Sequence, residues 1–281
     1  MGVIEAPQWL VPAFVRSAKA IGANAPTEQI ETVGDALVAS WSSPDRFHHA
    51  IKHLVDVLAS IDQLAEETHD PDVVRIAGWY HGAEFCSNAR ASYGHRGGED
   101  PQAGALRAAR ELPEIGVPQE IADRVAELIS QIHRHSASTV DVDAQALSDA
   151  DLATLACEPQ KYAAYRKNIR AEYAHIPVED YLEARLAILN KLVARSRIFC
   201  SPMAAMWEEP ARENITAELA RLTAELEEYE STAVAPDAVA PTSEAPANSA
   251  ASANPAAREL SPETHDAPNS SSTLGRAPRF G

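Results

Sequence analysis

The chain has 281 residues, with 24 Lys and Arg against 41 Asp and Glu, which leaves a formal net charge of −17 at pH 7. This acidic balance argues against nucleic acid and anionic membranes as partners, because both repel a negatively charged protein. Three scattered cysteines, an odd number without a C-x-x-C spacing, indicate reduced thiols and predict a cytoplasmic location. No apolar run is long enough for a membrane span, and no signal peptide is predicted.

Apolar residues repeat at helical spacing along most of the chain. Leucine, isoleucine and valine recur every three or four residues over 51–61, 121–132, 182–193 and 215–226. Helix start signals stand at Ser43-Pro44-Asp45, Asp70-Pro71-Asp72 and Pro177-Val178-Glu179. No alternating run between hairpin turns is present, so we expect an all-α helical bundle.

Composition divides the chain into three predicted parts. We expect an N-terminal extension over 1–26, a helical domain over 27–229 and a tail over 230–281. The tail is rich in Ala, Pro and Ser and offers too little apolar surface to offset the entropy of ordering, so it is predicted to be disordered. Inside the domain, the glycine-containing segment SYGHRGGEDPQ (92–102) is predicted to be a surface loop near the functional site.

Histidine and carboxylate residues recur in short motifs of the helical part. Two of them, His49 and His53, are four residues apart, which would place both on one face of a helix. Mixed imidazole and carboxylate ligands suit a divalent cation that activates water. Alone, such a histidine pair is more often a polar-face or core feature than a metal site. The full set of candidates is His49, His53, His81, His133, His135, Asp149 and Asp151.

The order of these motifs resembles the HD superfamily of metal-dependent phosphohydrolases, and in particular a bacterial branch of predicted HD phosphohydrolases. That branch reads R-x-Y-H-x-x-x-H, then W-[FY]-H-D, Asn-Glu, Thr-x-x-His and D-A-D-L. The corresponding segments here are Arg46-Phe47-His48-His49 with His53, Trp79-Tyr80-His81-Gly82, Glu99-Asp100, Ile132-His133-Arg134-His135 and Asp149-Ala150-Asp151-Leu152. The resemblance covers about residues 35–226 and implies an HD-domain-like helical bundle.

Roles follow from the resemblance position by position. It implies that a divalent ion (Mn, Fe, Co or Mg) is bound by His49, His81 and Asp151, with Asp149 as the alternative aspartate. The implied catalytic residues are Asp149 and Asp151. Glu84 is a further candidate by spacing, because on a helix it would lie three residues after His81 and face roughly the same way, where it could substitute for the missing carboxylate. The implied substrate-binding positions are His53, His135 and Asp100.

Gly82 stands where the family has the aspartate of its His-Asp pair. Losing a ligand predicts metal binding that is weak or absent, and substitution of Gly82 by Asp is expected to strengthen it. We therefore expect an HD-like protein with a binding or regulatory role and weak or no turnover. The alternative is an active phosphohydrolase acting on a nucleotide or another small phosphomonoester. A further alternative is an interaction protein that uses its tail. The sequence leaves the substrate and the oligomeric state open.

Overall fold

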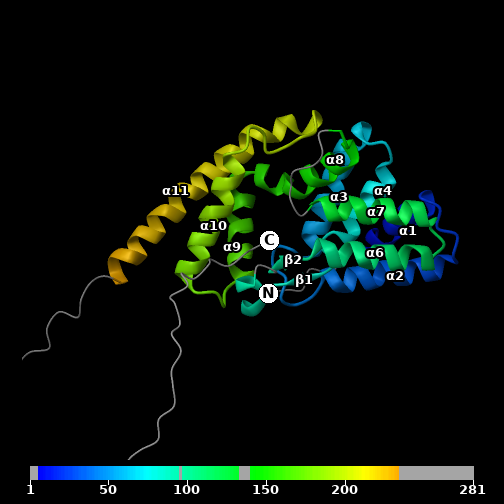
Figure 1. Cartoon of the computed structure of the whole chain (residues 1–281), viewed down its shortest axis with the longest axis horizontal. Coiled ribbons are helices and arrows are strands. Elements are labelled where there is room, and N and C mark those ends of the chain that lie inside the picture. The colour runs from blue at the N-terminus through cyan, green and yellow to red at the C-terminus, as the bar shows by residue number, and fades with distance from the viewer. Residues whose placement is uncertain (1–5, 95–96, 133–139, 234–281) are drawn as a thin grey trace, which may run out of the picture.

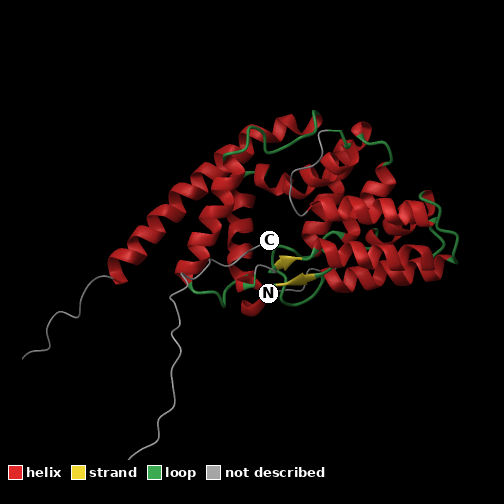
Figure 2. Cartoon of the chain, viewed as in Figure 1, coloured by secondary structure: helices red, strands yellow, loops and turns green. Residues whose placement is uncertain are grey.

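The computed structural model describes residues 6–94, 97–132 and 140–233 (Figure 1). Within these ranges the chain is helical apart from one short two-stranded antiparallel hairpin, which confirms the predicted all-α class (Figure 2). The predicted tail boundary at residue 230 is too early, because α11 continues to Ala233; the rest of the predicted tail, 234–281, lies outside the described residues. Among the described residues, no helix has the length and apolar character that crossing a membrane requires.

The elements follow one another as a series of helices interrupted once by the hairpin. They are α1 (Leu10–Ala20), α2 (Thr27–Trp41), α3 (Ile51–Leu64), η1 (Ala65–Glu67), α4 (Pro71–Tyr80), β1 (Phe85–Cys86), α5 (Ala89–Tyr93), β2 (Gly98–Glu99), α6 (Pro101–Glu114), α7 (Gln119–Ile132), α8 (Val142–Leu152), η2 (Ala153–Ala156), α9 (Pro159–Glu172), α10 (Val178–Val193), η3 (Met203–Trp207) and α11 (Glu208–Ala233).

Two hydrophobic cores organise these helices. The first is built by α1 to α4 and α6 to α8 around the fully buried Phe14, Trp41 and Trp79. The second joins α9, α10 and α11 around Tyr173 and Phe199, and it forms the side of the molecule opposite α1, α2 and α6 in Figure 1. Because the ring of Phe14 packs edge-on against Trp79 at 5.2 Å, α1 is an integral part of the first core although it precedes the predicted domain start at residue 27.

The candidate site depends on where α4 ends and how the chain continues. Asp70 caps α4, since its side chain accepts from the N–H groups of Asp72 and Val73, as the Asp-Pro start signal predicts. At the other end, α6 approaches the last turn of α4 closely, because a Cβ on Gly104 would lie only 2.4 Å from the carbonyl oxygen of Tyr80. The end of α4 is therefore packed closely against α6.

Candidate functional site

His81 follows α4 directly and is fully buried. Its Nδ1 lies 2.6 Å from the carbonyl oxygen of Gly78, so Nδ1–H donates there and Nε2 is left to face the interior. This Nε2 has no hydrogen-bond partner among the described residues. The nearest acidic oxygens are Asp151 Oδ1 at 3.5 Å and Glu99 Oε1 at 3.8 Å. Burial lowers the pKa of His81, but these two carboxylates outweigh it and raise that pKa to about 9.

A second imidazole completes the cluster. His53, in the first turn of α3, places Nε2 3.0 Å from Asp151 Oδ1, so this oxygen lies within reach of both histidines. The ligand atoms of His53, His81 and Glu99 all lie within 4.8 Å of one another. The carboxylates of Glu99 and Asp151 are only 12% and 11% exposed. We name these four residues, His53, His81, Glu99 and Asp151, the His–acid cluster.

Glu99 was absent from the sequence-based candidates, which assigned its neighbour Asp100 to the site. Glu99 is in β2, which pairs antiparallel with β1 so that Glu99 is opposite Phe85. Glu99 turns inward from β2, whereas Asp100 follows the strand and begins the next helix. Asp100 is exposed, and its carboxylate accepts the N–H of Ala103 at 2.9 Å as the N-cap of α6. The Asp100-Pro101 sequence is itself a helix start signal and could have assigned this role.

His49 does not lie on α3 with His53, contrary to the expectation from their spacing. The helix begins at Ile51, and His49 is in the turn before it. Its Nδ1–H donates to Glu172 Oε2 at 2.8 Å. The other oxygen of Glu172 accepts the N–H groups of Phe47, His48 and His49 at 2.7, 2.7 and 2.8 Å. His49 is therefore beside the cluster, with its ring centroid 5.7 Å from that of His53, and is held by α9.

Glu172 stays ionised in this buried position for an identifiable reason. Burial by itself raises the pKa of a carboxyl group, but the charge of His49 and the N–H groups directed at Glu172 outweigh that effect and lower its pKa. Burial also opposes protonation of His49, and the same Glu172 carboxylate outweighs it and raises the pKa of His49. The pair fixes the chain entering α3, which carries His53.

Asp149 and Asp151 have different roles, which the D-A-D motif could not distinguish. The Asp149 carboxylate accepts the N–H of Cys200 at 2.9 Å and that of Ser201 at 2.6 Å, so it anchors the segment before η3. It is not part of the His–acid cluster, and its predicted catalytic role is not supported. Of the two aspartates, Asp151 is the one that reaches His53 and His81.

Glu84 also lies away from the cluster, contrary to its proposed role as a substitute carboxylate. The helix ends before it, at Tyr80, so the helical spacing from His81 does not apply. Its side chain is 44% exposed and pairs with Arg107 at 3.2 Å. His135 lies outside the described residues.

Arg46 braces the turn that follows His81. It is buried and donates to the carbonyl oxygens of His49 at 2.9 Å, Gly82 at 2.7 Å and Ala83 at 2.9 Å. Burial lowers the pKa of its guanidinium, and nearby carboxylates led by Glu99 oppose that effect. One side chain therefore connects the segment entering α3 with the segment leaving α4, which are the segments that position the two histidines.

Residues of the second hydrophobic core lie next to the His–acid cluster. The ring of His48 lies 4.7 Å from the ring of His53 and 4.7 Å from that of Tyr165 on α9. The Tyr165 hydroxyl accepts from Arg185 on α10 at 2.9 Å, and Arg185 in turn pairs with Glu218 on α11 at 3.0 Å. These contacts place aromatic and cationic side chains of the second core next to the His–acid cluster.

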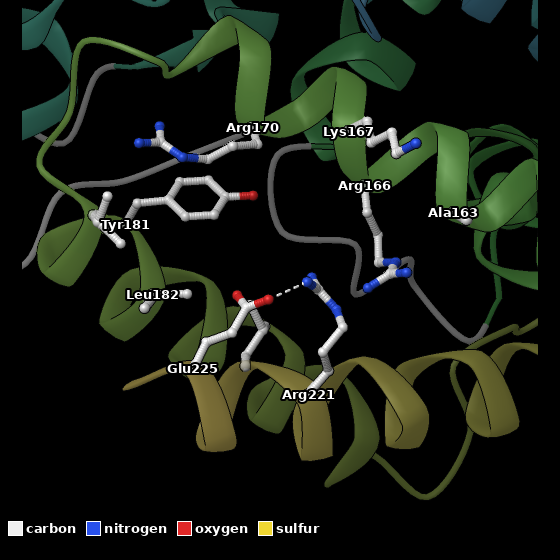
Figure 3. Close-up of a pocket in the computed structure, with 10 residues that line it drawn as sticks. Ala163, Arg166, Lys167, Arg170, Tyr181, Leu182, Arg221 and Glu225 are labelled. Carbon is white, nitrogen blue, oxygen red and sulfur yellow. Dashed lines mark hydrogen bonds and ion pairs between the residues drawn. The ribbon is translucent and has the colours of Figure 1, made fainter. Parts of the chain in front are cut away.

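A separate cavity of about 370 Å³ lies among α9, α10 and α11 (Figure 3). Arg170 lies over the ring of Tyr181 at 4.7 Å, and Arg221 pairs with Glu225. Figure 3 shows the ring of Tyr181 and the paired Arg221 and Glu225 facing the space between the helices, with Arg170 extended over the ring. The lining residues are Ala163, Arg166, Lys167, Arg170, Val178, Tyr181, Leu182, Arg221, Leu222 and Glu225.

Comparisons with known proteins found no matching family model, curated protein or solved structure. Membership of the HD superfamily therefore stays an expectation based on the quoted motifs. What the chain can do chemically is argued below from the side chains that the structure brings together.

Proposed function

We propose that the protein is an HD-like, divalent-metal-dependent phosphoric ester hydrolase whose metal site is the His–acid cluster. The observation that carries the proposal is the buried Nε2 of His81, which has no hydrogen-bond partner among the described residues and faces two carboxylates. Unpaired polar atoms and like charges are costly in a buried position, and a bound cation relieves both costs. This observation supports metal binding, which the active alternative requires.

The donor set fits a transition metal better than magnesium. Two imidazole nitrogens suit Mn(II), Fe(II) or Co(II), whereas Mg²⁺ prefers an all-oxygen shell. The donated Nδ1–H of His81 leaves its Nε2 available as a ligand, which is the arrangement usual for metal-binding histidines. With neutral imidazoles, Glu99 and Asp151 contribute two negative charges that match a divalent cation.

The chain's own residues would organise the substrate around this site. A bound divalent ion would supply a Lewis acid that polarises a phosphoryl oxygen and lowers the pKa of a water molecule. Glu172 and Arg46 hold the two segments that carry the histidines, while His48 and Tyr165 limit the opposite side. We expect a small phosphorylated molecule as the substrate. The odd number of scattered cysteines favours a cytoplasmic location.

The test uses the purified full-length chain with Mn²⁺, Fe²⁺, Co²⁺ or Mg²⁺ and a panel of nucleotides and p-nitrophenyl phosphate. We expect hydrolysis that needs added metal, and a loss of at least about 100-fold in kcat/KM in His81→Ala. The matched control is His69→Ala, because His69 is exposed and outside the cluster. Equal activity in wild type and His81→Ala, or no metal-dependent hydrolysis of any substrate in the panel, would refute the proposed function.

The cavity of Figure 3 favours a second candidate function, which is binding of a small anionic molecule without turnover. Four cationic side chains line it in a chain whose net charge is −17. Arg170 donates to backbone carbonyl oxygens and Arg221 pairs with Glu225, so Arg166 and Lys167 are the cations assigned to the anion in this candidate. Calorimetric titration with pyrophosphate in chelator tests this candidate, and the variant Arg166→Ala/Lys167→Ala should lose any binding while leaving metal binding at the cluster unchanged.

A further inference from the structure

Glu99 fills the space that a side chain at position 82 would need. A Cβ added to Gly82 would lie 2.0 Å from Glu99 Oε1 and 2.4 Å from Cη2 of Trp41. Trp41 is fully buried, and its indole Nε1–H donates to the carbonyl oxygen of Trp79 at 2.9 Å. The ring therefore has little freedom to move away. On this backbone only glycine fits at position 82 while Glu99 keeps its place.

The hairpin explains how Glu99 reaches this position from seventeen residues further along the chain. Pairing of β1 with β2 and a hydrogen bond from Asp100 N–H to the Glu84 carbonyl oxygen at 2.9 Å bring β2 back alongside the segment that follows Gly82. Gly98, at φ +93°, makes the turn into Glu99 in a conformation that favours glycine. Oε1 of Glu99 then lies buried without a hydrogen-bond partner, 3.8 Å from His81 Nε2.

We propose that Glu99 is a metal ligand that takes the place of a side chain at position 82, and that Gly82 is required to make room for it. This inference rests on the proposed metal site and adds which part of the chain supplies its second carboxylate. The unpartnered Oε1 of Glu99 supports its role as a ligand, and the contacts that a Cβ at position 82 would make with Glu99 and Trp41 support the requirement for glycine. It also reverses the expectation that Gly82→Asp strengthens binding, because the new side chain would displace an existing ligand and repel its charge.

A double-mutant cycle on positions 82 and 99 tests, through metal affinity, whether Glu99 is a ligand that a side chain at position 82 would displace. Wild type, Gly82→Ala, Glu99→Ala and the double variant are titrated with Mn²⁺ by calorimetry and with Co²⁺ by visible absorption. Each single variant should bind at least about 10-fold more weakly, in line with the loss or displacement of a ligand. The double variant should lose less affinity than the sum of the two single losses, because Glu99 is already gone and only the contact of the new Cβ with Trp41 remains.

Two further variants keep the test independent of folding. Glu99→Gln preserves the volume and removes the charge, and it should weaken Mn²⁺ binding at least about 10-fold with unchanged circular dichroism. Asp100→Asn is the control, since an asparagine can still cap α6, and it should bind Mn²⁺ like the wild type.

The outcomes separate this inference from the proposed function. Wild-type affinity in Glu99→Gln, additive effects in the cycle, or tighter binding in Gly82→Asp would each overturn the role of Glu99. If one of these results is obtained but His81→Ala abolishes Mn²⁺ binding, the proposed metal site is retained and only the role of Glu99 is rejected. A wild type that binds no metal would overturn both.

Discussion

Removing the carboxylate of Glu172 should destabilise the protein more than any surface substitution. This side chain is buried and accepts three backbone N–H groups and the Nδ1–H of His49. A hydrogen bond to a charged group contributes roughly 1.5–3 kcal/mol, and a buried donor left without a partner costs about 1–3 kcal/mol. The four donors share one acceptor group and are not additive, so we expect Glu172→Ala to lower the free energy of unfolding by about 3–5 kcal/mol.

Urea unfolding followed by circular dichroism measures this change as a lower midpoint at an unchanged slope. Glu172→Gln keeps an acceptor oxygen and should cost less than Glu172→Ala. Glu179→Ala, on an exposed position of α10, serves as the control and should shift stability by no more than about 0.5 kcal/mol. A Glu172→Ala variant within about 1 kcal/mol of wild type would show that the segment before α3 is held by something else.

Three other predictions concern pH, the two aspartates and the metal. The hydrogen bonds from Arg124 lower the pKa of Asp141 in the folded state. Asp141→Asn, which retains the N-cap of α8, should therefore lose about 1 kcal/mol at pH 7, and the deficit should vanish as the pH falls from about 3.9 through that lowered pKa. Asp151→Asn should weaken Mn²⁺ binding at least about 10-fold with little change of stability in chelator. Asp149→Ala should do the reverse, costing about 2–4 kcal/mol in urea unfolding and leaving Mn²⁺ affinity unchanged. Adding excess chelator to protein held with Mn²⁺ at about 100 times its Kd should remove about 2.7 kcal/mol of stability, and an unchanged melting temperature would contradict bound metal.

Local sequence signals were sufficient for the helical class and for several helix starts. Apolar spacing of three and four residues depends only on which residues neighbour one another along a helix, and the capped start at Asp70-Pro71 depends on adjacent residues. The same Asp-Pro signal at Asp100-Pro101 marks the N-cap of α6, although the sequence analysis assigned Asp100 to substrate binding. The start of α3 was misplaced because a distant residue, Glu172, accepts the N–H groups of the turn before it.

The sequence by itself determined the α-helical class, and it singled out His53, His81 and the Asp149-Ala150-Asp151 motif as candidates for one site. Tertiary structure alone decided which carboxylates arrive there. Asp151 and not Asp149 meets His81, because α8 directs one aspartate to the histidines and the other to the backbone of residues 200 and 201. Glu99 occupies the space beside Gly82 because the hairpin returns it there. Such convergence depends on strand register and helix packing across long separations, which no local spacing encodes.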